Sequence, residues 1–166
     1  PRRVNRYSIS TSNLPPIKES LVKSIHARLK VIFPVRFTPG SDMFADKGWR
    51  NFIEYASHYI QAKGGDPEAV AFICFNKGNK FEEAKRIIKE RGIETFFHWF
   101  DVMPFHELYS MIHDADVVVD QLADQWVGVG MWGGLLGKPV ICHLSNEAKR
   151  NLFVGSYFLN AANAEQ

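Results

Sequence analysis

Two basic residues in the first third of the chain have the type and spacing to bind a diphosphate. Arg36 directly follows the apolar run VIFPV, and Lys47-Gly48 directly precedes a helix-periodic segment that starts at Trp49. If the apolar run is a strand of a parallel sheet, both cations lie at the edge where such sheets bind ligands. Two fixed cations beside the free N–H groups of a helix start suit phosphate oxygens. The alternative is that both are solvated loop charges, as most surface charges are.

A second set of candidate ligand-binding residues follows the β-branched run from Val117 to Val119. Asp120 and Gln121 stand directly after this run, and a glycine-rich segment, Gly128 to Gly137, comes next. We expect the run to be a buried strand and the glycines to form a loop that a phosphate can approach closely. A ligand is therefore expected at the end of this strand.

Part of that segment, GVGMWG from Gly128 to Gly133, also matches the G-x-G-x-x-G pattern of dinucleotide-binding folds, and Glu147 lies 19 residues past its first glycine. The spacing argues against this interpretation. Seven residues separate Asp120 from Gly128, whereas the glycines should follow the strand at once. Only residues 134–138 remain before the next apolar run, which is too few for the usual crossover helix.

Other catalytic or metal-binding patterns are missing from the sequence. It contains no H-x-x-x-H, CxxC or G-x-S-x-G pattern and no carboxylate cluster with ligand spacing, so we expect no metal or cofactor. Trp126 and Trp132 could stack on a base or sugar ring, or could fill core space that the glycines leave.

The elements that must position these residues alternate along the chain. Strands are predicted at residues 31–35, 69–75, 95–100, 117–119 and 139–142, with helices at 16–28, 49–63, 81–91 and 104–113. On the last two helices the predicted inward residues are Ala84, Ile87, Ile88, Phe105, Leu108 and Ile112. This alternation predicts an α/β fold, a Rossmann-like parallel sheet flanked by helices. Residues 1–15 are expected to be an arm or linker, 16–166 the domain, and 146–166 one short helix and an extended piece.

Composition narrows the class of protein. The chain has 166 residues, enough for one domain with a real core, and a net charge of +2, which gives no global attraction to nucleic acid. Cys74 and Cys142 each lie within an apolar run, which indicates reduced core thiols of a cytoplasmic protein. No apolar stretch is long enough to span a bilayer, so any association with a membrane would come through the rest of a longer protein.

Several motifs in order resemble the carboxyl-terminal half of GT-B fold glycosyltransferases, the retaining group-one type (family four). In that family a strand ending in Arg leads through a loop to Lys-Gly at a helix start, as VIFPVR does here with Lys47-Gly48. A helix and a strand beginning Ala-Asp-Val follow, matched by HELYSMIHDADVVVD. The family's G-K-P-V-I ending is matched residue for residue from Gly137 to Ile141. The resemblance covers most of residues 17–145.

The resemblance implies the roles of the candidate residues. Arg36 and Lys47 would hold the diphosphate of a nucleotide-sugar donor, and the backbone around Gly48, Gly128, Gly130 and Gly133 would cradle phosphate or sugar. Of the family's two spaced glutamates, the first is replaced by Asp124, a conservative change for a sugar contact. The second, which grips the ribose, is replaced by Trp132, which cannot accept hydrogen bonds from hydroxyl groups.

The resemblance also implies partners that the chain itself does not contain. A glycosyltransferase of this type has an amino-terminal acceptor domain, absent here, and an acceptor such as a glycan or lipid. We therefore expect a fragment of a longer enzyme that binds its donor but does not turn over alone. The alternatives are a catalytically degenerate module for assembly or glycan binding, in which Trp132 has replaced the ribose acid, and a dinucleotide-binding Rossmann domain.

Overall fold

The chain folds around a parallel β-sheet, seen in a computed structural model that describes residues 14–39, 47–123, 128–143 and 158–160. The sheet has six strands in the order β3-β2-β1-β4-β5-β6, all neighbours parallel. The strands are β1 Lys30–Phe33, β2 Ala71–Phe75, β3 Phe97–Phe100, β4 Val117–Val119, β5 Val140–Cys142 and β6 Phe158–Asn160. The α-helices are α1 Trp49–Ala62, α2 Phe81–Glu90, α3 Phe105–Asp114 and α4 Val129–Leu135. The predicted Rossmann-like α/β fold is confirmed.

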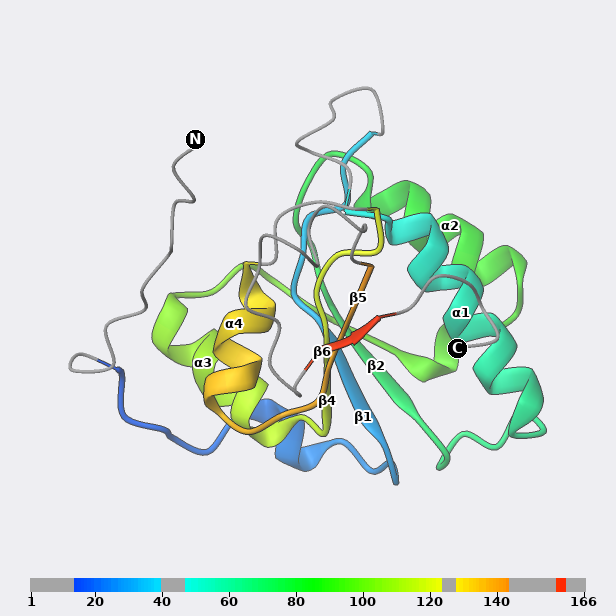
Figure 1. The fold of residues 1–166 in the computed structure, drawn as a ribbon. Helices are drawn as coiled ribbons and strands as arrows, with labels where there is room; N and C mark the ends of the chain where they lie inside the picture. Colours follow the sequence, from blue (N-terminus) through cyan, green and yellow to red (C-terminus); the bar gives the residue numbers. More distant parts are fainter. Residues whose placement is uncertain (1–13, 40–46, 124–127, 144–157, 161–166) are drawn as a thin grey trace.

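Helices cover both faces of the sheet, α1 and α2 on one side and α3 and α4 on the other (Figure 1). Neighbouring residues of a strand point to opposite faces of the sheet. Because helices cover both faces, most positions of the strands are buried and apolar. Phe33 of β1 stacks on Phe52 of α1, with ring centroids 4.1 Å apart, whereas the adjacent Ile32 packs in the same cluster as Ile112 of α3. This two-sided burial explains why the strand sequences are continuous apolar runs.

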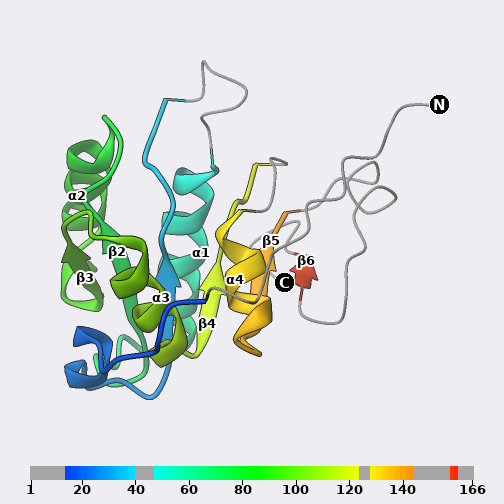
Figure 2. The ribbon, with the colours of Figure 1, turned by 90° about the vertical axis from the view of Figure 1, so that its left-hand side faces the viewer.

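The strand order places a switch point between β1 and β4. From β1 the chain builds outward through β2 to β3, and β4 then returns to the other side of β1 (Figure 2). In open parallel sheets the loops at the carboxyl ends of the strands diverge at such a point and leave room for a ligand. The loops after β1 and β4, which carry Arg36 and Asp120, flank this position.

The helix predicted over residues 49–63 is confirmed as α1, and its apolar residues face the core. Trp49, Phe52, Ile53, Ala56 and Ile60 are all buried. The helix ends before Gly64 and Gly65, which have φ of +68° and +70° and so take the left-handed conformation that terminates a helix.

The helix predicted over residues 16–28 is wrong. Only the 3-10 turn η1, Leu21–Ser24, forms there. Ser20 donates both its N–H and its hydroxyl to Oδ2 of Asp114, at 3.0 and 2.9 Å, and the N–H of Lys18 bonds the hydroxyl of Ser110. The segment therefore satisfies its polar groups against α3, and Leu21 is exposed.

Two further expectations need correction. The glycine-rich segment is helix α4 and not a loop, because its glycine face packs directly on the sheet. Phe105, expected to point inward, is 43% exposed at the start of α3. In the last part of the chain the extended piece is β6, and the short helix expected between residues 146 and 166 lies outside the described residues.

One further helix turn, η2 Glu94–Phe96, takes the first residues of the strand predicted at 95–100. On α2 the inward positions are confirmed, with Ala84 and Ile88 buried and Ile87 partly so. None of the helices in the described ranges has both the length and the apolar character to cross a bilayer.

Candidate functional site

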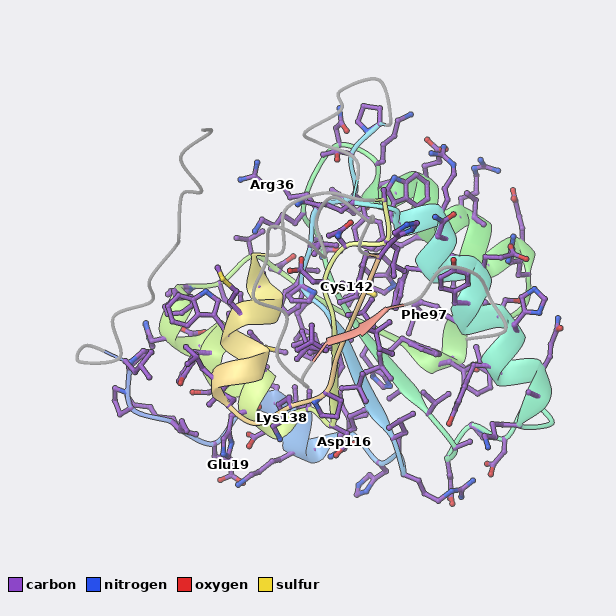
Figure 3. All side chains as sticks on the ribbon, in the orientation of Figure 1. Glu19, Arg36, Phe97, Asp116, Lys138 and Cys142 are labelled. Carbon is purple, nitrogen blue, oxygen red and sulfur yellow. The ribbon has the colours of Figure 1, made fainter. Side chains whose placement is uncertain are left out.

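Arg36 lies where the sequence places it, in the loop after β1 at the carboxyl edge of the sheet. The residues on either side of it are buried, and its own side chain is exposed. Figure 3 shows Arg36 at this edge, while Asp116 and Lys138 lie at the opposite one. The lysine of the G-K-P-V-I motif therefore stands at the amino end of β5, away from the candidate site.

Lys47 and Gly48 are held against the loop that follows β4. The N–H of Leu122 bonds the carbonyl of Lys47 at 2.9 Å, and the amide of Asn51, in the first turn of α1, donates to the carbonyl of Leu122 at 3.0 Å. Gly48 has φ of +71°, and a Cβ there would lie 2.5 Å from the carbonyl carbon of Leu122. Only glycine permits both this conformation and this approach. These contacts fix Lys47 beside the end of β4.

Within the described residues, the start of α1 carries no side-chain cap from its N-cap residue and no acidic side chain. Its N-cap, Gly48, has no side chain to bond the first N–H groups. The helix is 14 residues long, so the partial positive charge of its first turn is fully developed. Lys47 directly precedes this helix start, and its positive charge acts on Asp120 at the end of β4.

Asp120 is buried, with 1% of its surface exposed, and it caps α4. Its Oδ2 accepts the N–H groups of Gly128 and Gly130 at 2.6 and 2.9 Å. Burial raises the pKa of Asp120, against these two hydrogen bonds and the charge of Lys47, which lower it. The N–H groups expected to cradle phosphate at the two glycines are thus bonded to Asp120 in this structure.

Gln121 is fully buried and ties β4 to β5. Its side-chain amide donates to the carbonyl of His143 and accepts the N–H of Ala123 at 3.0 Å, while its own carbonyl accepts the N–H of His143 at 2.8 Å. These bonds fix the two strand ends relative to each other. Gln121 thereby shapes the loop against which Lys47 is held.

Trp132 and Gly133 face neighbouring elements. The Trp132 ring packs on two aromatic residues of α3, with centroids 4.9 Å from Phe105 and 6.2 Å from Tyr109. Gly133 is buried, and a Cβ there would lie 2.8 Å from Cγ2 of Val118. The glycine lets α4 approach the sheet, and the tryptophan joins α4 to α3. Asp124 lies outside the described residues, as does Trp126.

Lys77 is a cation at the same edge that sequence reasoning missed. It follows β2 by two residues and is half-buried. Burial and the positive charge of Arg36 hold the pKa of Lys77 below its usual value. The sequence does carry a signal for Lys77, because this residue stands shortly after a buried strand, as Arg36 does. A search for cations after every predicted strand would have found it.

The remaining polar candidates have other surroundings. The described residues contain no group of three or more His, Cys, Asp and Glu side chains that could hold a metal ion. Both cysteines are buried free thiols. Burial and the nearby charge of Asp120 raise the pKa of Cys142 to about 12, so this thiol is not a nucleophile at neutral pH.

The sequence has no detectable relatives among the families and curated proteins compared. No protein-family model matches it, and neither does any curated protein. Solved structures do match. The C-terminal domain of a glycosyl transferase group 1 family protein, LpcC, from Francisella tularensis is 16% identical with a TM-score of 0.60, and the match covers 91% of this chain and 78% of that one.

Two longer proteins match over a smaller part of their length. Staphylococcus aureus TarM, solved with UDP, is 14% identical with a TM-score of 0.67, and the match covers 95% of this chain and 29% of TarM. Anabaena HepE, solved with UDP and glucose, is 15% identical with a TM-score of 0.58, over 82% of this chain and 36% of HepE. This chain thus spans about a third of these proteins. It has the fold of the carboxyl-terminal half of a GT-B glycosyltransferase.

Proposed function

We propose that this chain is the donor-binding domain of a glycosyltransferase that transfers a sugar from a nucleotide diphosphate sugar to an acceptor. The observation that carries the proposal is the placement of Lys47 and the start of α1 beside the end of β4, at the switch point of the sheet. The resemblance over residues 17–145 and the UDP bound in the similar structures of HepE and TarM agree with it.

The chemical task of such a site is to stabilise a leaving diphosphate. Negative charge accumulates on the diphosphate as the bond to the sugar breaks. Arg36, Lys47 and the N–H groups of the first turn of α1 would bind that charge, and the bond that holds the backbone of Lys47 would limit the reorganisation needed. This role needs no metal ion, and retention of stereochemistry follows only from the resemblance. The acceptor and the remaining catalytic groups would come from an amino-terminal domain.

Isothermal titration calorimetry of the chain with UDP, GDP, ADP and NAD tests the proposal. We expect saturable binding of one nucleoside diphosphate, and a loss of about 10- to 100-fold in affinity on removal of either Arg36 or Lys47, since each makes a charge-assisted bond to phosphate. Lys138→Ala removes one positive charge from the opposite edge and is the matched control for Lys47→Ala. Binding of NAD alone would instead favour a dinucleotide-binding domain.

One observation favours a second candidate, a degenerate module that has lost nucleotide binding. By the resemblance, Trp132 stands where the family has its ribose-binding glutamate, and its ring packs against α3. The acidic residue nearest to it in the described sequence is Asp120, which already bonds the start of α4. A folded chain that binds no nucleoside diphosphate would establish this alternative, and Trp132→Glu would then be expected to restore measurable affinity.

A further inference from the structure

Arg36 and Lys77 lie in the loops that follow two neighbouring strands, β1 and β2. β1 and β2 are parallel, and their register pairs Phe33 with Cys74. Arg36 lies three residues beyond Phe33, and Lys77 lies three residues beyond Cys74. Because the carboxyl ends of parallel strands meet at one edge of a sheet, both residues lie at the same edge, after neighbouring strands.

The backbone around Phe37 holds the two loops together. The N–H of Phe37 bonds the carbonyl of Lys77 at 2.8 Å, and the carbonyl of Phe37 accepts the N–H of Lys80 at 2.9 Å. Gly78 has φ of +96°, and a Cβ there would lie 2.1 Å from the oxygen of Phe37. Phe37 itself is fully buried. These contacts therefore fix the backbones of Arg36 and Lys77 relative to each other.

No carboxylate compensates this pair within the described part of the chain. The ion pairs there include neither Arg36 nor Lys77, whereas Lys80, in the same loop, lies 2.7 Å from Glu83. Among the described residues, the charge that acts on Lys77 is that of Arg36, and it is repulsive. A half-buried lysine beside an arginine raises the energy of the fold unless an anion binds between them.

We propose that Lys77 is a third cation of the diphosphate site and binds the same anionic group as Arg36. Lys77, Arg36 and Lys47 then form a row across the ends of β2, β1 and β4, the three strands at and beside the switch point. This inference rests on the proposed function, since it assigns a further residue to the same site. A bound anion would also give the partly buried charge of Lys77 a partner of opposite sign.

The test compares Lys77→Met with Lys80→Met by calorimetry at low salt, using inorganic pyrophosphate and the preferred nucleoside diphosphate as probes. Both changes remove one charge from one loop, but the charge of Lys80 is paired with Glu83. We expect Lys77→Met to lower the affinity for both probes about 10- to 100-fold and Lys80→Met to change these affinities less than about 3-fold. Lys77→Met should fold at least as well as wild type, because it removes a buried charge and a repulsion; Lys77→Arg should keep binding.

The outcomes separate this inference from the proposed function. If Lys77→Met binds both probes as wild type does, Lys77 is not part of the site, while nucleotide binding stands. If wild type binds no nucleotide more tightly than it binds pyrophosphate, the donor-domain proposal fails. The pyrophosphate affinity of Lys77→Met still decides the role of Lys77 in that case. A folded wild-type chain that binds neither probe overturns both. If Lys77→Met does not fold, Lys77→Gln and Lys77→Arg provide the comparison.

Discussion

The buried carboxylate of Asp120 offers a sharp test of how the candidate site is held together. Replacing Asp120 with alanine leaves the N–H groups of Gly128 and Gly130 without their acceptor. Gly130 is buried, so its orphaned N–H costs about 1–3 kcal/mol, whereas Gly128 is exposed and water can replace the lost bond. Asp120→Ala should therefore lower the free energy of unfolding by about 1–3 kcal/mol, which for a chain of this size is about 2–4 °C in Tm per kcal/mol.

Asparagine separates the hydrogen bonds from the charge. Its amide oxygen can still accept the N–H groups, so Asp120→Asn should cost less than about 1 kcal/mol at pH 7. The pKa of Asp120 is raised in the folded state, so the folded chain holds this proton more tightly than the unfolded chain does. The contribution of Asp120 to stability is then largest below its unfolded pKa of about 4 and falls as the pH rises through the folded value. Relative to Asp120→Asn, wild type should lose stability as the pH rises.

The assay is urea denaturation followed by circular dichroism from pH 3 to pH 8. Asp116→Ala is the matched control, because this exposed residue lies at the other end of the same strand and accepts a single backbone N–H, that of Lys30 at 2.7 Å. It should cost no more than about 1 kcal/mol. Equal stability of Asp120→Ala and wild type at pH 7 would refute the view that this carboxylate holds α4 in place.

Three further outcomes follow from close contacts and burial. Gly133→Ala should destabilise the chain by about 1–3 kcal/mol in thermal unfolding, because its Cβ would lie 2.8 Å from Cγ2 of Val118; unchanged stability would mean that α4 shifts freely. Gly48→Ala forces a left-handed alanine against the backbone of Leu122, so it should lower the free energy of unfolding by more than about 1 kcal/mol and abolish nucleotide binding. Normal affinity in calorimetry would contradict the role given to this contact. The thiol of Cys142, with its pKa of about 12, should react with Ellman's reagent at pH 8 only as fast as the chain unfolds; rapid reaction of the folded chain would show that it is accessible.

The sheet and most helices could be predicted because their signals are local. A continuous apolar run such as Val117 to Val119 is a strand buried on both faces, and a stripe such as Trp49, Ile53 and Ile60 can only be one face of a helix. Alternation of the two then fixes a parallel sheet. These features depend on neighbours within a few residues, which the sequence displays directly.

The errors arose where tertiary contacts override local preference. Residues 16–28 have helical spacing, but Ser20 and its neighbours find better partners in Asp114 and Ser110 of α3. The glycine-rich segment looks like a loop because glycine is a weak helix former. Gly133 is instead the residue that lets a helix lie on Val118, and that requirement is visible only once the sheet is in place.

For the candidate site, topology could be predicted but contacts could not. Strand ends place Arg36, Lys47 and Asp120 at one edge. The hydrogen bond between the backbones of Lys47 and Leu122, and the one from the start of α4 to Asp120, join segments that are distant in sequence. The sequence does not show which distant segments meet. The roles of Arg36 and Lys47 in binding stay predictions until the titrations are made.

The contact between α1 and the loop after β4 has a consequence for how the chain folds. Asn51 and Leu122 are 71 residues apart in sequence, and everything from α1 to α3 must be placed between them. Bringing such distant residues together costs loop entropy before any contact compensates for it, so pairs of this kind tend to form late. During synthesis from the amino terminus, β1, α1 and β2 can assemble well before β4 emerges. Lys47 would then gain its fixed position only in the last stage of folding, and local unfolding of the β4 end alone would release it again.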